Sequence, residues 1–225
     1  MFFFDSTMIL ILPALALTIY AQFKVKSAFT QMSKVRSASG LTGADVAKSL
    51  LKRNSIYDVA VEEVSGNLTD HYDSKAKKLR LSSDVYHSSS LAALGVAAHE
   101  TGHAIQHKMS YAPLNVRQSI FPVANLGSSM GIPLFIGGLI FSIRPLLDLG
   151  IIVFTGAVVF HIVTLPVEFN ASSRAMAQLS SGGYLKAEEV AGAKKVLNAA
   201  ALTYVAAAAM AVLQLVRLIL IRGND

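Results

Sequence analysis

The sequence predicts a mainly α-helical integral membrane protein with about four transmembrane helices and a small polar α+β segment that carries a short β-hairpin or sheet. Two observations predict this class. Of the 225 residues, 53% are hydrophobic and only 15% are charged. The apolar residues also gather in four blocks that approach the ~20 residues a helix needs to span a bilayer. These blocks cover residues 6–23, 121–143, 146–165 and 197–220.

Charges beside the first block predict how it is oriented. Lys24 and Lys26 follow the block, and no Lys or Arg precedes it, which predicts an uncleaved span whose N-terminal end faces outward. If all four blocks span the bilayer, 17 of the 20 Lys and Arg residues lie on the cytoplasmic side. The net charge of +6 then reflects topology and contact with anionic lipid. We therefore expect a multi-pass protein of the cell membrane, whose partners include the lipid bilayer and no nucleic acid.

Between the first two blocks lies the main polar segment, residues 24–119. Its predicted elements are a basic helix at 22–35, a helix at 43–53 capped by Thr42, extended runs at 59–64 and 78–82, and a helix at 88–107. A second polar segment covers residues 166–196. The main polar segment, residues 24–119, is by itself only marginally large enough for an independent core. We therefore expect residues 1–225 to act as one unit.

The helix expected at 88–107 contains the sequence His99-Glu100-Thr101-Gly102-His103. Residues i and i+4 lie on one face of a helix, so the two imidazoles can share one Zn²⁺. Glu100 then lies on the flank, where it can hold the water bound to the metal. The chain has no cysteine, so every ligand must be His, Glu or Asp. The alternative is a buried helix whose histidines only form hydrogen bonds, which is costly without a metal.

A catalytic zinc usually has three protein ligands, so a third one is needed. The downstream carboxylates are Asp148, Glu168, Glu188, Glu189 and Asp225. The predicted topology puts the first and last of these across the membrane, and the adjacent pair at 188 and 189 resembles a solvated helix face. Glu168, at the cytoplasmic end of the third block, is therefore the expected ligand. His107 is excluded because eight residues of helix separate it from His99 by ~12 Å.

Four segments outside the long apolar runs carry a resemblance to a known family. They have the sequences LTDHYD, KLRLS, AAHETGHAIQH and LPVEFNAS, and they begin at residues 68, 78, 97 and 165. Together they resemble the YugP-like membrane zinc metallopeptidases, which are related to HtpX-type and CAAX prenyl proteases among the gluzincins. The resemblance covers essentially the whole chain.

This resemblance implies a zincin-like catalytic segment in which His99, His103 and Glu168 bind zinc and Glu100 is the catalytic base. One position departs from the family pattern. Related gluzincins often have an aspartate four residues after the ligand glutamate, where it hydrogen-bonds a zinc histidine. Here that position is Ser172, so either Asn170 or Ser172 is left to fill this role.

The expected chemistry is zinc-assisted peptide hydrolysis, in which Glu100 takes a proton from the attacking water. The tetrahedral oxyanion also needs a donor. His71 is the first candidate, with Tyr72, Tyr111 and Arg174 behind it, although His71 can equally belong to a turn held by its own hydrogen bonds. The strand at 79–81 is a candidate edge for an extended substrate, and a purely structural strand is an equal alternative.

Ligands near the ends of membrane spans place the expected metal at the cytoplasmic side, close to the membrane surface. We therefore expect peptide or protein substrates that are associated with the membrane. The alternative function is a non-enzymatic metal-binding membrane protein, which is either transporter-like or a degenerate protease that acts as a scaffold. Transport sites normally lie near the bilayer midplane, whereas the histidine pair lies in a polar segment.

Overall fold

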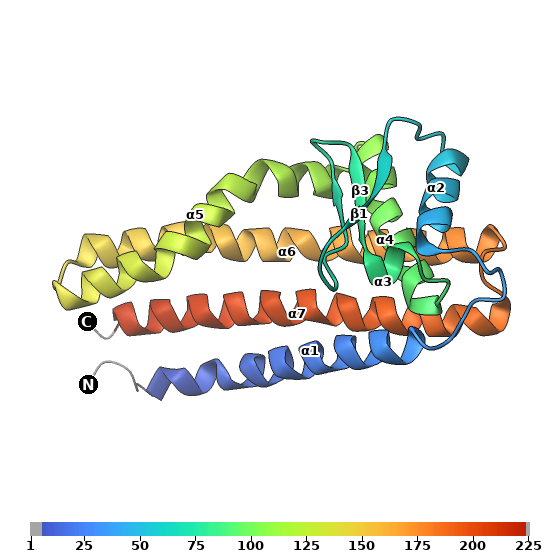
Figure 1. Ribbon diagram of the computed structural model, residues 1–225. Helices are drawn as coiled ribbons and strands as arrows, with labels where there is room; N and C mark the ends of the chain where they lie inside the picture. Colours follow the sequence, from blue (N-terminus) through green and yellow to red (C-terminus); the bar gives the residue numbers. More distant parts are fainter. Residues whose placement is uncertain (1–5, 224–225) are drawn as a thin grey trace. The chain divides into compact units, whose positions relative to one another are not determined.

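The computed structural model describes residues 6–223, which divide into two compact units. We call residues 6–22, 115–166 and 202–223 the apolar unit. Residues 23–114 and 167–201 form the α+β unit. Long helices continue from one unit into the other, and each unit is described by itself (Figure 1). The expectation that residues 1–225 act as one functional unit stays a prediction.

The apolar unit consists of a short 3₁₀-helix and parts of four α-helices, of which three are long and apolar enough to cross a membrane. These three are α5 (Ala112–Ile140), α6 (Arg144–Ser181) and α7 (Ala187–Gly223). Two glycines allow α5 to approach α6 closely, as is common between membrane helices. A Cβ atom added at Gly127 would lie 2.4 Å from the carbonyl oxygen of Val153, and one at Gly131 would lie 2.7 Å from Cβ of Phe154.

The first apolar block is divided between a short 3₁₀-helix, η1 (Ser6–Leu10), and the first part of α1 (Leu12–Met32). Helix α1 is not among the three candidate spans of residues 6–223. Its second half continues through Lys24 and Lys26, which lower its mean hydropathy. The architecture of a mainly helical membrane protein with a small sheet is confirmed, while the fourth span stays a prediction.

In the α+β unit, helix α2 (Gly43–Arg53) begins and ends where the sequence predicts. The hydroxyl oxygen of Thr42 accepts a hydrogen bond from the backbone N–H of Asp45, and the carboxylate of Asp45 accepts one from the backbone N–H of Thr42. This reciprocal capping box satisfies two N–H groups at the start of the helix. Val46 and Leu50 then pack into a core shared with α4 (Leu91–Lys108), α6 and α7.

The sheet has three strands, β1 (Ala60–Val64), β2 (His71–Asp73) and β3 (Lys78–Ser82), in the order β1-β3-β2. Strand β3 pairs in parallel with β1 and antiparallel with β2. The expectation that residues 79–81 offer an edge to a substrate is wrong, because β3 is the central strand. Strand β2 was not predicted, because its three residues are too few to show an alternating pattern.

Helix α4 (Leu91–Lys108) contributes to both cores of the α+β unit, and it contacts strands β2 and β3 of the sheet (Figure 1). The hydroxyl of Ser90 caps its first turn by accepting a hydrogen bond from the backbone N–H of Ala93. One side of α4 packs Leu94 and Ala98 against α2 and α6, and another packs Ala97 and Ile105 against the sheet. A short helix, α3 (Ser83–Tyr86), precedes it. These contacts fix the rotation of α4 about its axis.

Candidate metal centre

Three metal-ligating side chains converge between α4 and α6 within the α+β unit. The Nε2 atoms of His99 and His103 lie 3.2 and 3.5 Å from Oε2 of Glu168. A tetrahedral zinc with bonds of about 2.0–2.1 Å holds its ligand atoms about 3.3 Å apart. The side chains of the two histidines are each 12% exposed, and that of Glu168 is 3% exposed. The donors, their spacing and their burial therefore fit a zinc ion.

Gln106 orients the ring of His103. Its side-chain amide nitrogen donates to the carbonyl oxygen of Val167, at 2.8 Å, and to Oδ1 of Asn170, at 3.0 Å. These two bonds leave the amide oxygen to accept from Nδ1–H of His103, at 2.9 Å. A proton on Nδ1 makes Nε2, the ring nitrogen on the side of Glu168, the one that can bind a metal. Gln106 is fully buried, and no sequence pattern indicated this role.

Ser172 occupies the corresponding place beside His99. Its hydroxyl oxygen lies 3.1 Å from Nδ1 of His99, so Nε2 of this ring also faces Glu168. Asn170, the alternative partner, instead hydrogen-bonds Gln106 and accepts from Nε of Arg174 at 2.7 Å. Of the two residues left open by the sequence, the structure therefore puts Ser172 against a histidine and Asn170 one contact further away.

Gly102 permits the close approach of α4 and α6 on which this cluster depends. A Cβ atom added at Gly102 would lie 2.7 Å from the carbonyl oxygen of Ala171, which cannot move without shifting the backbone of α6. Gly102 lies between the two histidines, and Ala171 lies between Glu168 and Ser172. The glycine therefore sets the distance between the two helices that supply the three candidate ligands.

We expect Gly102→Ala to lower the free energy of unfolding by about 1–3 kcal/mol, because it overpacks this contact. The variant should also bind zinc more weakly than the wild type. Gly95→Ala is the matched control on the same helix, since its Cβ atom would lie an ordinary 3.6 Å from Ala193. Denaturant unfolding and zinc titration of both variants test this, and equal behaviour of the two would contradict it.

We expect Gln106→Leu to weaken zinc binding by roughly 10- to 100-fold, the usual effect of losing a partner that orients a ligand. The change removes the acceptor for Nδ1–H of His103 and the amide group that donates to the carbonyl of Val167. Gln178→Leu is the control, because Gln178 lies on α6 and bonds Asn54 rather than a candidate ligand. Competition with a fluorescent chelator measures both affinities. An unchanged affinity in folded Gln106→Leu would contradict the prediction.

The expected base, Glu100, is 9% exposed and lies on α4 between the two histidines. Asp70 lies close enough to interact with its charge. The carboxylate of Asp70 accepts hydrogen bonds from the backbone N–H and the hydroxyl of Ser82. Burial raises the pKa of Asp70 above its usual value, and the charge of Glu100 raises it further. The sequence does not indicate that Asp70 lies near Glu100, because this depends on how β2 packs against α4.

Electrostatic effects oppose one another at His103. Burial of its ring lowers the pKa, but the hydrogen bond to Glu168 and the charges of Glu100 and Glu168 outweigh burial. The net effect is a pKa above the ordinary value for histidine. A cation at this position is therefore stabilised by the two surrounding carboxylates, which is the charge complement that a divalent metal requires.

His71, the candidate oxyanion donor, is exposed on β2 and is not part of this cluster. The guanidinium of Arg80 donates towards its Nε2, so its Nδ1–H donates to the carbonyl of Thr69. In this arrangement the ring has no N–H left to donate. Of the candidates behind it, Tyr72 hydrogen-bonds His107, and Arg174 bonds Asn170. His71 as the oxyanion donor stays a prediction that requires its ring to turn.

Two of the carboxylates that were not chosen as ligands, Asp148 and Glu189, have other hydrogen-bond partners in the structure. Asp148 accepts two hydrogen bonds from the guanidinium of Arg222, at 2.8 and 3.1 Å, within the apolar unit. Glu189 accepts from the backbone N–H of Ala38. Asp225 lies outside the described residues.

Apolar helices of spanning length, combined with a buried cluster of two histidines and one glutamate, define a membrane protein with a candidate metal centre. Residues 7–223 match the family described as "Putative neutral zinc metallopeptidase", and the chain belongs to this family. It is 50% identical over 218 residues to the "Putative membrane protease YugP" of Bacillus subtilis (strain 168). The aligned residues cover 96% of this chain and 97% of that protein. No solved structure matches the chain. The resemblance expected from the sequence is confirmed.

Proposed function

We propose that this protein is a membrane-embedded, zinc-dependent endopeptidase that hydrolyses peptide bonds of membrane or membrane-proximal proteins. The observation that carries the proposal is the convergence of two Nε2 atoms and one carboxylate oxygen at 3.2 and 3.5 Å, beside the buried Glu100. The family and the membrane protease of Bacillus subtilis support the same class of activity.

His99, His103 and Glu168 would hold the metal. When bound, zinc lowers the pKa of a coordinated water towards ~7 and polarises the scissile carbonyl. Glu100 accepts one proton from the attacking water, whose oxygen bonds to the carbonyl carbon. The same carboxyl group then delivers the proton to the leaving nitrogen as the C–N bond breaks, which yields a carboxylic acid and an amine.

A peptide substrate would pair with β2 rather than with β3. Strand β2 is an edge of the sheet, and it packs against α4, which carries Glu100. Pairing with an edge strand holds an extended peptide by its main chain, independently of most side chains. Such pairing would bring the substrate beside His71. The ring would then turn away from Thr69 and Arg80 and donate to the oxyanion.

The site would face the cytoplasm near the membrane surface. Support for this orientation comes from the excess of Lys and Arg in the segments that form the α+β unit. Substrates would then be membrane proteins or their membrane-proximal segments. Cysteine-accessibility labelling at an exposed position such as Lys75, in inverted and right-side-out vesicles, tests the orientation. Labelling from the outside would contradict it.

The full chain, purified in detergent, should cleave an unfolded protein such as casein or a reconstituted membrane protein. Treatment with 1,10-phenanthroline should abolish the cleavage, and added zinc should restore it. Zinc binding without cleavage of any substrate would favour the non-enzymatic alternative. Cleavage that survives complete zinc removal would contradict the proposed mechanism.

A further inference from the structure

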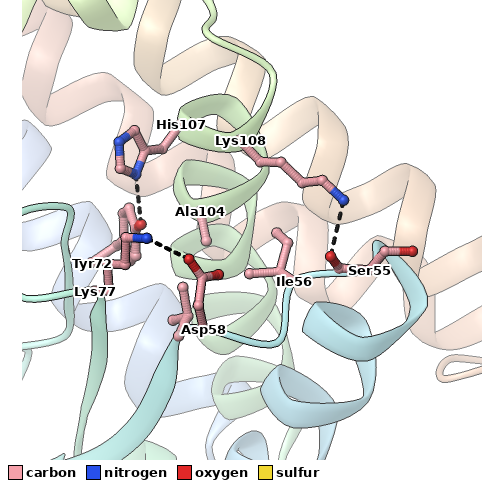
Figure 2. A pocket seen from close by; sticks show the side chains of 9 residues that line it. Ser55, Ile56, Asp58, Tyr72, Lys77, Ala104, His107 and Lys108 are labelled. Atoms are coloured by element: carbon pink, nitrogen blue, oxygen red, sulfur yellow. Dashed lines mark hydrogen bonds and ion pairs between the residues drawn. The ribbon is translucent and has the colours of Figure 1, made fainter.

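A cavity of about 370 Å³ lies in the α+β unit beside the C-terminal end of α4, the helix that carries the metal cluster (Figure 2). Buried Ile56 and Ala104 form an apolar part of its wall. The wall also contains polar groups from three other places in the chain, namely Asp58 before β1, Tyr72 of β2 and Lys77 before β3. The cavity therefore shares α4 and β2 with the proposed peptidase site.

The charges that line this cavity do not balance. Lys77 forms an ion pair with Asp58 (Figure 2). Lys108, the other lysine in the wall, pairs with no carboxylate among residues 6–223. The cavity thus carries one positive charge in excess, before any contribution from His107.

Lys108 is held in a fixed position. Its ammonium group donates to the carbonyl oxygens of Asn54 and Ser55, at 2.6 and 3.0 Å. These carbonyls follow the C-terminal end of α2, where the helix dipole attracts a cation. An ammonium group has three N–H donors, so one remains for a ligand. A lysine whose position is already fixed loses less conformational entropy on binding than a mobile surface lysine does.

Tyr72 connects the cavity to the strand that would hold a substrate. Its hydroxyl lies 2.8 Å from Nδ1 of His107 (Figure 2). Burial, together with the charges of Asp58 and Asp73, raises the pKa of Tyr72 to about 12. The hydroxyl therefore keeps its proton at neutral pH and adds no negative charge to the cavity.

We propose that this cavity is a specificity subsite that receives an acidic side chain of the peptide substrate, with its carboxylate on Lys108 and its methylene groups against Ile56 and Ala104. The proposal rests on the peptidase function above. Lys108 follows the candidate ligand His103 by five residues, which is ~7.5 Å along α4. Five residues also rotate Lys108 by about 140° about the axis of α4, and an extended peptide advances ~3.3 Å per residue, so the acidic residue lies more than two residues from the scissile bond.

The test uses decapeptides in pairs that differ only by Glu or Gln, with the variable residue placed at each position in turn. The wild-type full chain in detergent should cleave the glutamate peptide with a kcat/KM about tenfold higher at one position, the effect of one charge-assisted hydrogen bond. Lys108→Met should remove this preference. Asp58→Asn, which leaves Lys77 without its counter-ion, should increase it. Lys194→Met removes another exposed lysine, which lies outside the cavity, and should change nothing.

A binding measurement separates failure of the subsite from failure of the peptidase function. Fluorescence anisotropy with labelled peptides of the same pairs is carried out on the Glu100→Gln chain. If the wild-type chain cleaves no peptide, but glutamate peptides bind the Glu100→Gln chain more tightly than glutamine peptides and this difference depends on Lys108, the subsite stands and the peptidase function fails. If cleavage occurs with no Glu preference, or if the preference survives Lys108→Met, the subsite is overturned. Lys108-dependent binding of inorganic phosphate or phosphatidylglycerol vesicles, without binding of acidic peptides, also overturns it.

Discussion

Replacing Glu100 with glutamine is expected to lower kcat/KM for peptide hydrolysis by roughly 100- to 10,000-fold, the range associated with general acid–base groups. Glutamine has nearly the same shape as glutamate but cannot accept and return the proton. The three candidate ligands are unchanged, so the variant should still bind zinc. Peptide cleavage followed by mass spectrometry, together with metal analysis of the same preparation, measures both properties.

Glu188→Gln is the matched control, since Glu188 is exposed in the first turn of α7 and has no place in the metal cluster. It should cleave as fast as the wild type. Activity of Glu100→Gln within tenfold of the wild type would remove Glu100 from the mechanism. Loss of zinc in Glu100→Gln would instead assign Glu100 to metal binding.

Replacing Glu168 with alanine is expected to weaken zinc binding by a factor on the order of 1,000, if three ligands share the large binding energy of a structural zinc site. Glu168 supplies the only carboxylate of the cluster, and its Oε2 lies beside both imidazoles. Without it, the two histidines retain Gln106 and Ser172 but lose the third donor. Zinc titration at equilibrium measures the affinity.

Glu168→Gln serves as the companion variant, because it preserves the volume of the side chain while it removes the charge. Both variants should lose affinity, and the alanine variant should also lose stability from the cavity it creates. Zinc binding at wild-type affinity in a folded Glu168→Ala chain would reject Glu168 as the third ligand.

The candidate metal cluster could be predicted from the sequence because two of its three ligands are close together in the chain. His99 and His103 lie one helical turn apart wherever that segment is helical, and few downstream carboxylates compete with Glu168. The helix that carries Glu168 continues through Pro166, so the glutamate lies within α6 rather than in a polar segment after it. Glu168 still reaches both histidines from this position.

The partners of the cluster could not be predicted, since they depend on packing between segments far apart in the chain. Gln106 reaches Val167 and Asn170, and Asp70 reaches Ser82 and the charge of Glu100, only after α4, α6 and the sheet are assembled. Gly102 gives a weak hint in the sequence. Glycine is unfavourable within a helix, so its presence there suggests that another backbone lies close by. Strand order is likewise tertiary information, which is why the central position of β3 was not foreseen.

Zinc-edge X-ray absorption of the purified full chain tests the central claim most directly. The account predicts one zinc per chain with nitrogen and oxygen ligands at about 2.0–2.1 Å and the scattering pattern of two imidazoles. It also predicts that the imidazole pattern is reduced in His99→Ala and in His103→Ala. Tightly bound zinc whose spectrum is the same in the wild type and in both of these variants would contradict the account.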